Sequence, residues 1–409
     1  MSFSYAHLPL ASLHHSLGSL FNYVGFVLVC VAVTKLAQLR FERTEVIALS
    51  GCLVILIAAV LGQALKSLMF RSGSAEADLV VHSALTFPSA VLPLVAVLLI
   101  VRLASMTSFT FRDLAHATRF ATIILCGYLA IELLGARFEI EPFATIVRLV
   151  SRYLNYRDDL DMLGGRLRGF SNEPSYLAVV VVFMCAVVLV DNTVSDLKRY
   201  SLLMVVLALS SASLSKNIFV GLMVLLIVHA LYFRRLIPMM AIVLATLVAL
   251  FYANLGQSEA ILQQYEDFGI DISTLTRVGS WVAAWNGFLE NPLFGNGLGL
   301  TGKLLVAHYP EWFYSSPEAS QWEVASAAFG TPVFSNLFRT LFELGLFGVV
   351  FVAFQLFSFT RISNSRSLLA HDNAILLTAF LVSYGMVDVL TFWPWYAALA
   401  IRRPAGEVR

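Results

Sequence analysis

Residues 45–65 of the 409-residue chain read EVIALSGCLVILIAAVLGQAL, an apolar run whose single ionisable residue, Glu45, stands at its start. A helix needs about 20 largely apolar residues to cross a hydrocarbon core of about 30 Å thickness, and this stretch has that length and character. The same pattern recurs along most of the chain. We therefore predict an all-α, polytopic integral membrane protein.

The composition of the whole chain agrees with this fold class. Hydrophobic residues make up 59% and charged residues 13% of the chain, whereas about a quarter of a soluble globular chain is charged. The net charge of +1 provides no basic surface for nucleic acid. Cys30, Cys52, Cys126 and Cys185 lie in apolar runs without CxxC spacing, so we expect packing residues rather than disulfides or metal ligands.

About ten segments are apolar enough to span the bilayer. They are Leu20–Val33, Glu45–Leu65, Leu85–Val101, Phe120–Leu134, Tyr176–Val190, Ser201–Leu214, Asn217–Phe233, Leu236–Tyr252, Phe334–Phe359 and Ala374–Leu390. The sixth and seventh segments are short and meet at Ser210–Lys216, so they form either a tight hairpin or one broken helix; we favour the hairpin. No soluble domain is recognisable, and residues 1–409 are predicted to form a single transmembrane domain.

Lysines and arginines in the short loops set the orientation, because cytoplasmic loops retain positive residues. Alternate loops carry them: Lys35, Arg40 and Arg43; Arg102, Arg112 and Arg119; Lys198 and Arg199; Arg234 and Arg235; Arg361 and Arg366. With these loops in the cytoplasm, two large loops, at about 135–175 and 254–333, lie on the periplasmic side. The second reads as helix, turn, helix, and we expect it to be ordered.

The first large loop ends in GGRLRGFSNEPS at residues 164–175. Arg166 and Arg168 stand next to glycines directly before a predicted helix. Guanidinium groups and the free N–H groups of a helix N-terminus together suit an anion such as a phosphate. Pro174 falls in the first turn of that helix, and Glu173 either complements the helix dipole or contacts a substrate.

The second large loop is acidic but contains Arg277. On a helix, Arg277 shares roughly one face with Trp281 and Trp285. Asn291-Pro292 then ends that helix ahead of the glycine-rich stretch 295–299. No strand precedes these glycines and no GK[ST] follows them, so we expect a tight bend that lets backbones approach, not a phosphate loop.

Two further polar places interrupt apolar segments. Lys216 lies at the outward turn between the sixth and seventh segments, where a lysine either snorkels to the interface or pairs with a substrate anion. Arg339 and Glu343 are one helical turn apart in the ninth segment. They either pair with each other alone or face a polar interior that receives a substrate.

These stretches together resemble a known family, the O-antigen polymerase and O-antigen ligase superfamily. The elements that carry the resemblance are RGFSNEPS at 168–175, SLSK at 213–216, RVGSWVAAW at 277–285, NPLFGNG at 291–297 and ELGLFG at 343–348. Each element is short. Their order and their positions on the predicted outward loops give the resemblance its specificity.

The resemblance implies a metal-independent glycosyltransferase with a GT-C-like fold. Such enzymes work in the bacterial inner membrane, need no cofactor, and use undecaprenyl-pyrophosphate-linked glycans at a site facing the periplasm. The ligases of this family typically carry a histidine just before the ELGLxG helix, where this chain has Phe334 followed by Ser335. This departure favours a Wzy-type polymerase. Such an enzyme would bind an undecaprenyl-pyrophosphate-linked donor and acceptor within the membrane lipid. A chain-length regulator protein is a possible further partner.

The chemistry of the implied reaction suits the polar residues of the chain. Cleavage of a sugar-1-pyrophosphate bond leaves negative charge on the diphosphate, which fixed cations stabilise. A carboxylate near the acceptor hydroxyl would remove or orient its proton. We expect Arg277 and Glu173 to be catalytic, and Arg166, Arg168, Lys216, Arg339 and Glu343 to bind substrate, with Glu343 a weaker alternative as the base. A ligase that uses lipid A core as acceptor, and a flippase with Glu132 and Asp388 as membrane-embedded charges, remain the alternatives.

Overall fold

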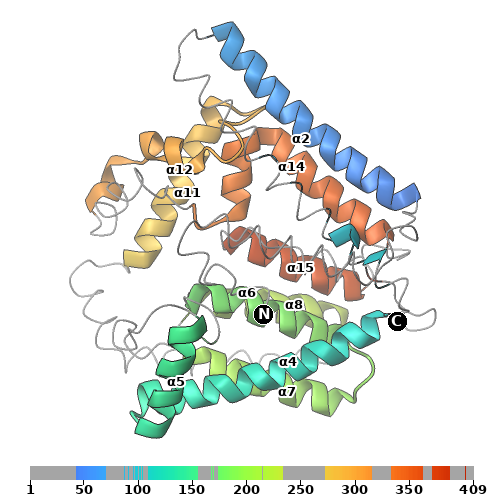
Figure 1. Cartoon of the computed structure of the whole chain (residues 1–409), viewed down its shortest axis with the longest axis vertical. Coiled ribbons are helices and arrows are strands. Elements are labelled where there is room, and N and C mark those ends of the chain that lie inside the picture. Colours follow the sequence, from blue (N-terminus) through green and yellow to red (C-terminus); the bar gives the residue numbers. More distant parts are fainter. Residues whose placement is uncertain are drawn as a thin grey trace.

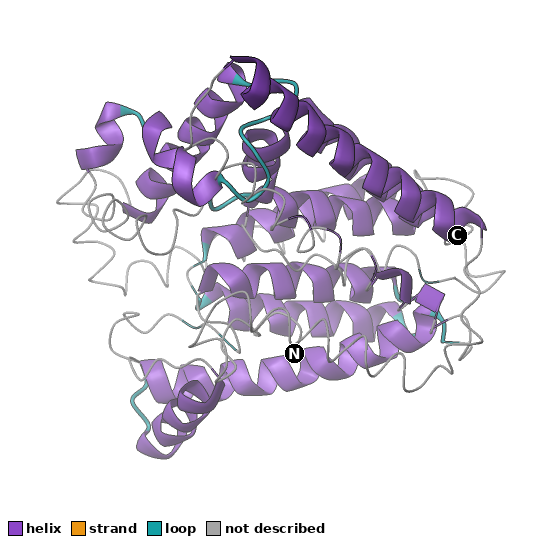
Figure 2. Ribbon diagram, turned by 45° about the horizontal axis from the view of Figure 1, so that its top comes forward, coloured by secondary structure: helices purple, strands orange, loops and turns teal. Residues whose placement is uncertain are grey.

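A computed structural model describes the fold of a large part of the chain. The described residues are 43–70, 109–154, 174–233 except Leu214, 272–315, 333–362 and 371–386, with single residues elsewhere. The predicted spans Leu20–Val33 and Leu236–Tyr252 and most of Leu85–Val101 lie outside them. Each remaining predicted span overlaps a described helix, and no strand occurs in the described ranges, so the all-α prediction is confirmed there (Figure 2).

The helices follow the apolar runs of the sequence. The long ones are α2 (Arg43–Phe70), α4 (Phe111–Glu132), α5 (Glu141–Leu154), α6 (Pro174–Val190), α7 (Asp196–Ser211), α8 (Lys216–Tyr232), α11 (Ile272–Glu290), α14 (Asn336–Ile362) and α15 (His371–Met386). The short ones are the π-helical turn η3 (Leu133–Arg137), α12 (Thr301–Leu304), and the 3-10 turns η6 (Leu305–His308) and η7 (Glu311–Ser315).

Helix α4 begins well before the predicted span, which started at Phe120. Its first turns are polar and therefore escaped a criterion based on hydropathy. Thr110 and Asp113 form a capping box there, in which the Thr110 N–H donates to Asp113 Oδ2 at 2.8 Å. This cap satisfies N–H groups that the helix itself leaves free, and so it stabilises the earlier start.

Three described helices are long and apolar enough to cross a membrane: Arg43–Gly62, Phe111–Arg137 and Asn336–Ser358. Leu177–Val190 and Asn217–Tyr232 are shorter apolar helices. On α2, large apolar side chains point away from the protein, with Val54 64% and Leu61 57% exposed. An exposed apolar surface of this kind fits contact with lipid tails rather than with water.

The main hydrophobic core lies where α6 packs against α8 and α15, with α4 and α7 beside them (Figure 1). Helix α6 is buried nearly all round, since Val181, Ala186 and Val187 are 0% exposed. A second unit forms where α2 packs along α14 (Figure 1). Cys52, Cys126 and Cys185 are buried and free, so their prediction as packing residues is confirmed; Cys30 lies outside the described residues.

Elements from the two predicted outward loops lie on the same side of the bundle. Helix α5 belongs to the first loop, and α11 and α12 belong to the second; both groups lie to the left in Figure 1 and in Figure 2. The described helices of the two large loops therefore lie at one end of the bundle.

Candidate active site

Helix α14 is sharply bent at Gly345. This glycine has φ 61° and ψ −144°, a backbone conformation outside the helical region and open to glycine alone. A bend of this kind interrupts the helical hydrogen bonds around it, which leaves carbonyl and N–H groups that need other partners. In Figure 1, α14 accordingly has a short arm beside α11 and α12 and a long arm along α2.

The loop 291–297 supplies those partners. The N–H of Asn296 donates to Phe342 O at 2.7 Å, and the N–H of Gly297 donates to Glu343 O at 3.0 Å. In return, the N–H of Leu346 donates to Pro292 O at 2.8 Å. The NPLFGNG and ELGLFG stretches, which are separate in the sequence, are therefore the two halves of one backbone junction.

Two glycines allow this close approach. A Cβ at Gly295 would overlap the backbone of Glu343 and Leu344. A Cβ at Gly345 would overlap the carbonyl oxygens of Pro292 and Leu293. Both glycines have positive φ, 69° and 61°. The expectation of a tight bend that lets backbones approach is confirmed.

The Asn296 side chain completes the junction. Its Nδ2 donates to Gly287 O, near the end of α11, at 2.9 Å and to Phe342 O at 3.3 Å. Its Oδ1 accepts a short hydrogen bond from Asn291 Nδ2. Asn296 thus ties α11, the loop and the bend of α14 together.

Glu343 lies at the centre of the junction and is 5% exposed. Its Oε1 accepts a hydrogen bond from Arg339 Nε at 2.9 Å and another from Thr301 Oγ1, at the start of α12. A buried carboxylate is costly unless it is paired, and these two donors pair it. The Arg339–Glu343 pair expected from the sequence is present, and it extends to a residue of the second loop.

Arg277 reaches the residues that lead into α14. Its guanidinium lies over the Phe334 ring, 5.8 Å from the centroid. One turn later, Ser280 Oγ donates to Val333 O at 2.8 Å, and Trp281 stacks on Phe338 with ring centroids 5.6 Å apart. These contacts fasten α11 to the first turn of α14 and to the residues just before it.

Phe334 itself has φ 57°, in the left-handed region. For an aromatic residue this conformation costs about 1–3 kcal/mol, and it persists only where the surroundings enforce it. Phe334, where the resemblance implied a histidine in the ligases, is therefore a strained point of the backbone, and the Arg277 guanidinium lies over its ring.

The turn before Lys216 is a hairpin, as favoured from the sequence. Helix α7 ends at Ser211 and α8 begins at Lys216, with Ser215 as its N-cap. The hydroxyl of Ser213 donates to Ser210 O at 2.6 Å and closes the turn. Lys216 is thus the first residue of a helix, where the helix dipole already favours an anion.

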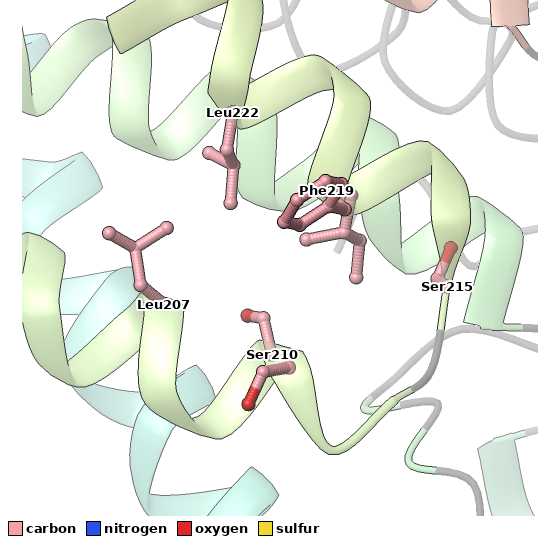
Figure 3. Close-up of a pocket in the computed structure, with 7 residues that line it drawn as sticks. Leu207, Ser210, Ser215, Phe219 and Leu222 are labelled. Atoms are coloured by element: carbon pink, nitrogen blue, oxygen red, sulfur yellow. The ribbon is translucent and has the colours of Figure 1, made fainter. Parts of the chain in front are cut away.

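A small pocket lies in the angle of this hairpin. Figure 3 shows Leu207 and Ser210 of α7 facing Phe219 and Leu222 of α8, with Ser215 at the start of α8. The hydroxyl groups lie near the turn and the apolar side chains lie deeper between the helices. The lining of this pocket thus changes from polar near the turn to apolar between the helices.

The structure brings part of the predicted set together. Arg277, Arg339 and Glu343 all belong to the contact of α11 with the start of α14. Lys216 lies on a different hairpin, and no described contact joins its backbone to that junction. Arg166, Arg168 and Glu173 lie outside the described residues, although α6 begins at Pro174 as predicted.

Several residues of the junction escaped the sequence analysis. Thr301, Ser280 and Asn296 each contact a residue more than forty positions away in the sequence. No local sequence pattern predicts contacts over such a separation. Asn296 stood within a glycine-rich stretch that was interpreted only as a bend. Within the described ranges, no three His, Cys, Asp or Glu side chains are grouped so that they could hold a metal ion.

The fold and the site define a helical membrane protein with a polar, hydrogen-bonded junction at one end of its bundle. Residues 200–353 match the Wzy_C family, described as O-antigen ligase. That stretch includes Lys216, the whole α11–α14 junction and both of its motifs, so the resemblance is confirmed over this part of the chain. The searches of curated proteins and of solved structures gave no match.

Proposed function

We propose that this protein polymerises lipid-linked oligosaccharide repeat units. It transfers the growing glycan from undecaprenyl pyrophosphate to the next undecaprenyl-pyrophosphate-linked unit, at the periplasmic face of the bacterial inner membrane. The observation that carries the proposal is the placement of Arg277 over Phe334, directly before the helix that carries the Arg339–Glu343 pair, in the region that matches the family.

The electrostatics of the junction support this reaction. The leaving diphosphate gains negative charge as the sugar–phosphate bond breaks, and preorganised cations stabilise that charge most strongly where water is excluded. Glu343 holds Arg339 in place, and the Phe334 ring lies beneath the Arg277 guanidinium, so neither cation needs to reorganise during the reaction. Arg166, Arg168 and Lys216 are the further cations of the proposed diphosphate site.

The proposed base is Glu173, the residue directly before α6. Glu343 is less suited to that task, because its Oε1 already accepts two hydrogen bonds and its side chain is buried. Its contacts support a role in holding Arg339 and the bend of α14 for the substrate. The acceptor hydroxyl would give its proton to Glu173 as it attacks the anomeric carbon.

Phe334 favours a polymerase over a ligase. A phenyl ring neither accepts nor donates a proton, so a reaction that needs a histidine at this position would lack its base. With Phe334 there, the Arg277 guanidinium lies over an aromatic face, which stabilises a cation.

The test uses purified full-length protein in lipid nanodiscs with undecaprenyl-pyrophosphate-linked repeat units. A polymerase produces a ladder of longer lipid-linked glycans. Glu173→Gln should abolish the ladder while substrate still binds. Failure of the parent protein to lengthen the glycan would refute the proposal, and movement of labelled lipid across vesicles without a new bond would identify a flippase.

The ligase is a second candidate, because the matching family is described as O-antigen ligase. Its acceptor would be lipid A core in place of a second lipid-linked repeat unit. A competition assay that offers both acceptors to the same donor separates the two activities. Product on lipid A core alone identifies a ligase, and Phe334→His then measures what the histidine position contributes to acceptor choice.

A further inference from the structure

Helices α5 and α11 lie across the bundle rather than along it. In Figure 1, α4 and α15 run from left to right, whereas α5 and α11 run up the page at the left end of the bundle. Helix α4 is long and apolar enough to cross a membrane as far as Arg137, and α5 begins four residues later, at Glu141. Helix α5 therefore begins close to the boundary of the bilayer.

The surface of α5 has three parts. One side is buried where α5 packs on α4 and η3, and Val147 on that side is 0% exposed. Ile146 and Leu149 form an exposed apolar stripe, since residues three apart share a helix face, and Leu149 is 57% exposed. Thr145 and Arg148 are also exposed and form a polar stripe beside it. The exposed half of α5 is thus divided into an apolar and a polar stripe.

Helix α11 in the second large loop is divided in the same way. One side packs on α14. Val278, Trp285 and Leu289 form an exposed apolar stripe along the helix, in which Leu289 is 58% exposed. Asn286 and Glu290 are exposed as well and form a polar stripe next to it. Two helices from different loops therefore expose the same kind of surface at the same end of the bundle.

The boundary of the bilayer suits both exposed surfaces. Apolar side chains are unfavourable in water in proportion to their exposed area. A helix that carries an apolar stripe beside a polar stripe lies flat in the membrane interface, with the apolar stripe among the acyl chains and the polar stripe toward headgroups and water. Trp285 fits this depth, because its ring is apolar and its N–H can reach water or a headgroup.

We propose that α5 and α11 are interfacial helices, held against the lipid surface by Ile146 and Leu149 of α5 and by Trp285 and Leu289 of α11. The side of α11 that packs on α14 belongs to the junction, so about one helix diameter, roughly 10 Å, separates the lipid from that junction. The inference concerns lipid contact alone, and it is independent of the reaction that the protein catalyses.

The experiment measures the surroundings of single nitroxide spin labels on the full-length protein in nanodiscs. All four cysteines are first replaced by alanine, and a label is then attached to Leu149→Cys on α5 or to Leu289→Cys on α11. Thr145→Cys and Glu290→Cys are the matched controls, because these residues are exposed on the polar stripes of the same two helices. Collision rates of each label with molecular oxygen, which enters lipid, and with a water-soluble nickel chelate are compared.

The ratio of oxygen to nickel collisions should be several-fold higher at Leu149→Cys and at Leu289→Cys than at the control on the same helix. Equal ratios would mean that the apolar stripes face water, and they would overturn the inference. Low collision rates with both reagents would overturn it too, because protein would then cover the stripes. Lipid contact by only one of the two helices would also contradict the proposal.

A second measurement uses the unmodified protein, and so it does not depend on the folding of the labelled variants. A lipid-soluble aryl diazirine, activated by light in the nanodisc, should insert into Ile146, Leu149 and Trp285, and mass spectrometry locates the modified residues. A water-soluble diazirine should modify Thr145 and Glu290 instead. Modification of the apolar stripes by the water-soluble reagent alone would refute lipid contact. Neither measurement requires a glycan substrate, so a failed ladder assay would leave this inference standing.

Discussion

The α11–α14 junction and the α6–α8–α15 core hold their helices together in different ways. The junction uses backbone hydrogen bonds, glycines with positive φ, and the polar side chains of Asn296, Thr301 and Glu343. The core uses mainly apolar side chains that are almost entirely buried, such as Leu225 and Leu376. One region depends on particular residues at particular positions, and the other depends on shape and volume.

This difference matters for function. Hydrogen bonds of backbone and side chains fix directions, so the junction can hold Arg277 and Arg339 at set places. Apolar packing fixes distances but is tolerant of the chemical identity of the side chains. We therefore expect substitutions in the junction to be costly and specific, and volume-conserving substitutions in the core to be mild.

The largest effect is expected for Arg277→Ala. Removing a preorganised cation from the leaving diphosphate should lower kcat about a hundred- to a thousand-fold, by analogy with the removal of one oxyanion donor. Arg277→Lys should recover only part of the rate, because lysine lacks the planar guanidinium fork. Initial rates of ladder formation measure both.

Arg148→Ala is the control for that substitution. Arg148 pairs with Glu141 on α5, and the two side chains are 56% and 72% exposed. An exposed pair of this kind contributes little to stability, so the rate should stay near that of the parent. If Arg148→Ala lowered the rate of ladder formation as much as Arg277→Ala, the rate would depend on positive charge anywhere on the outward side. It would then not depend on the position of Arg277 in the junction.

The next effect tests the backbone of the junction. Gly345→Ala should destabilise the protein by about 3 kcal/mol or more, because alanine is strained at this φ and ψ and its Cβ has no room. Gly385→Ala in α15 is the matched control, since a Cβ there meets nothing within 4 Å. In the control the helix should gain about 0.5–1 kcal/mol. Thermal unfolding in detergent micelles compares the two variants, and equal midpoints would contradict the bend.

A smaller effect is expected for Asn296→Ala. It removes the side-chain hydrogen bonds to Gly287 O and Phe342 O, and it leaves Asn291 Nδ2 without the Asn296 Oδ1 acceptor. The two carbonyls keep their backbone donors, so the cost should be about 1–2 kcal/mol. Asn286→Ala is its control, because Asn286 is exposed and its contact with His308 O is long, 3.4 Å. That control should stay within about 0.5 kcal/mol of the parent. The same unfolding measurement decides between them.

The core was largely predictable from the sequence, and the junction was predictable only in part. Apolar runs located α2, α6, α8 and α14, because lipid selects for hydropathy residue by residue. The order of the motifs identified the correct stretches of the junction. Hydropathy missed the polar start of α4, where capping by Asp113 and not apolar character extends the helix.

The missing part of the junction consists of contacts between residues distant in sequence. Thr301 meets Glu343, and Ser280 meets Val333, through single hydrogen bonds that follow from the fold as a whole. The left-handed conformation of Phe334 was equally hidden, since residues of this type rarely adopt it. Local patterns locate such residues without revealing their partners.

The smallest effect is expected in the core and gives the comparison its other limit. Leu225 is 1% exposed on α8, within the apolar cluster formed with α6 and α15. Leu225→Met keeps nearly the same volume and adds no hydrogen-bonding demand, so it should change stability by about 1 kcal/mol or less and leave the rate of ladder formation unchanged. Unfolding midpoints and initial rates of this variant and of Asn296→Ala, measured side by side, are decisive. If Leu225→Met lost as much stability as Asn296→Ala, the core would also require particular residues. The proposed difference between the apolar core and the hydrogen-bonded junction would then be wrong.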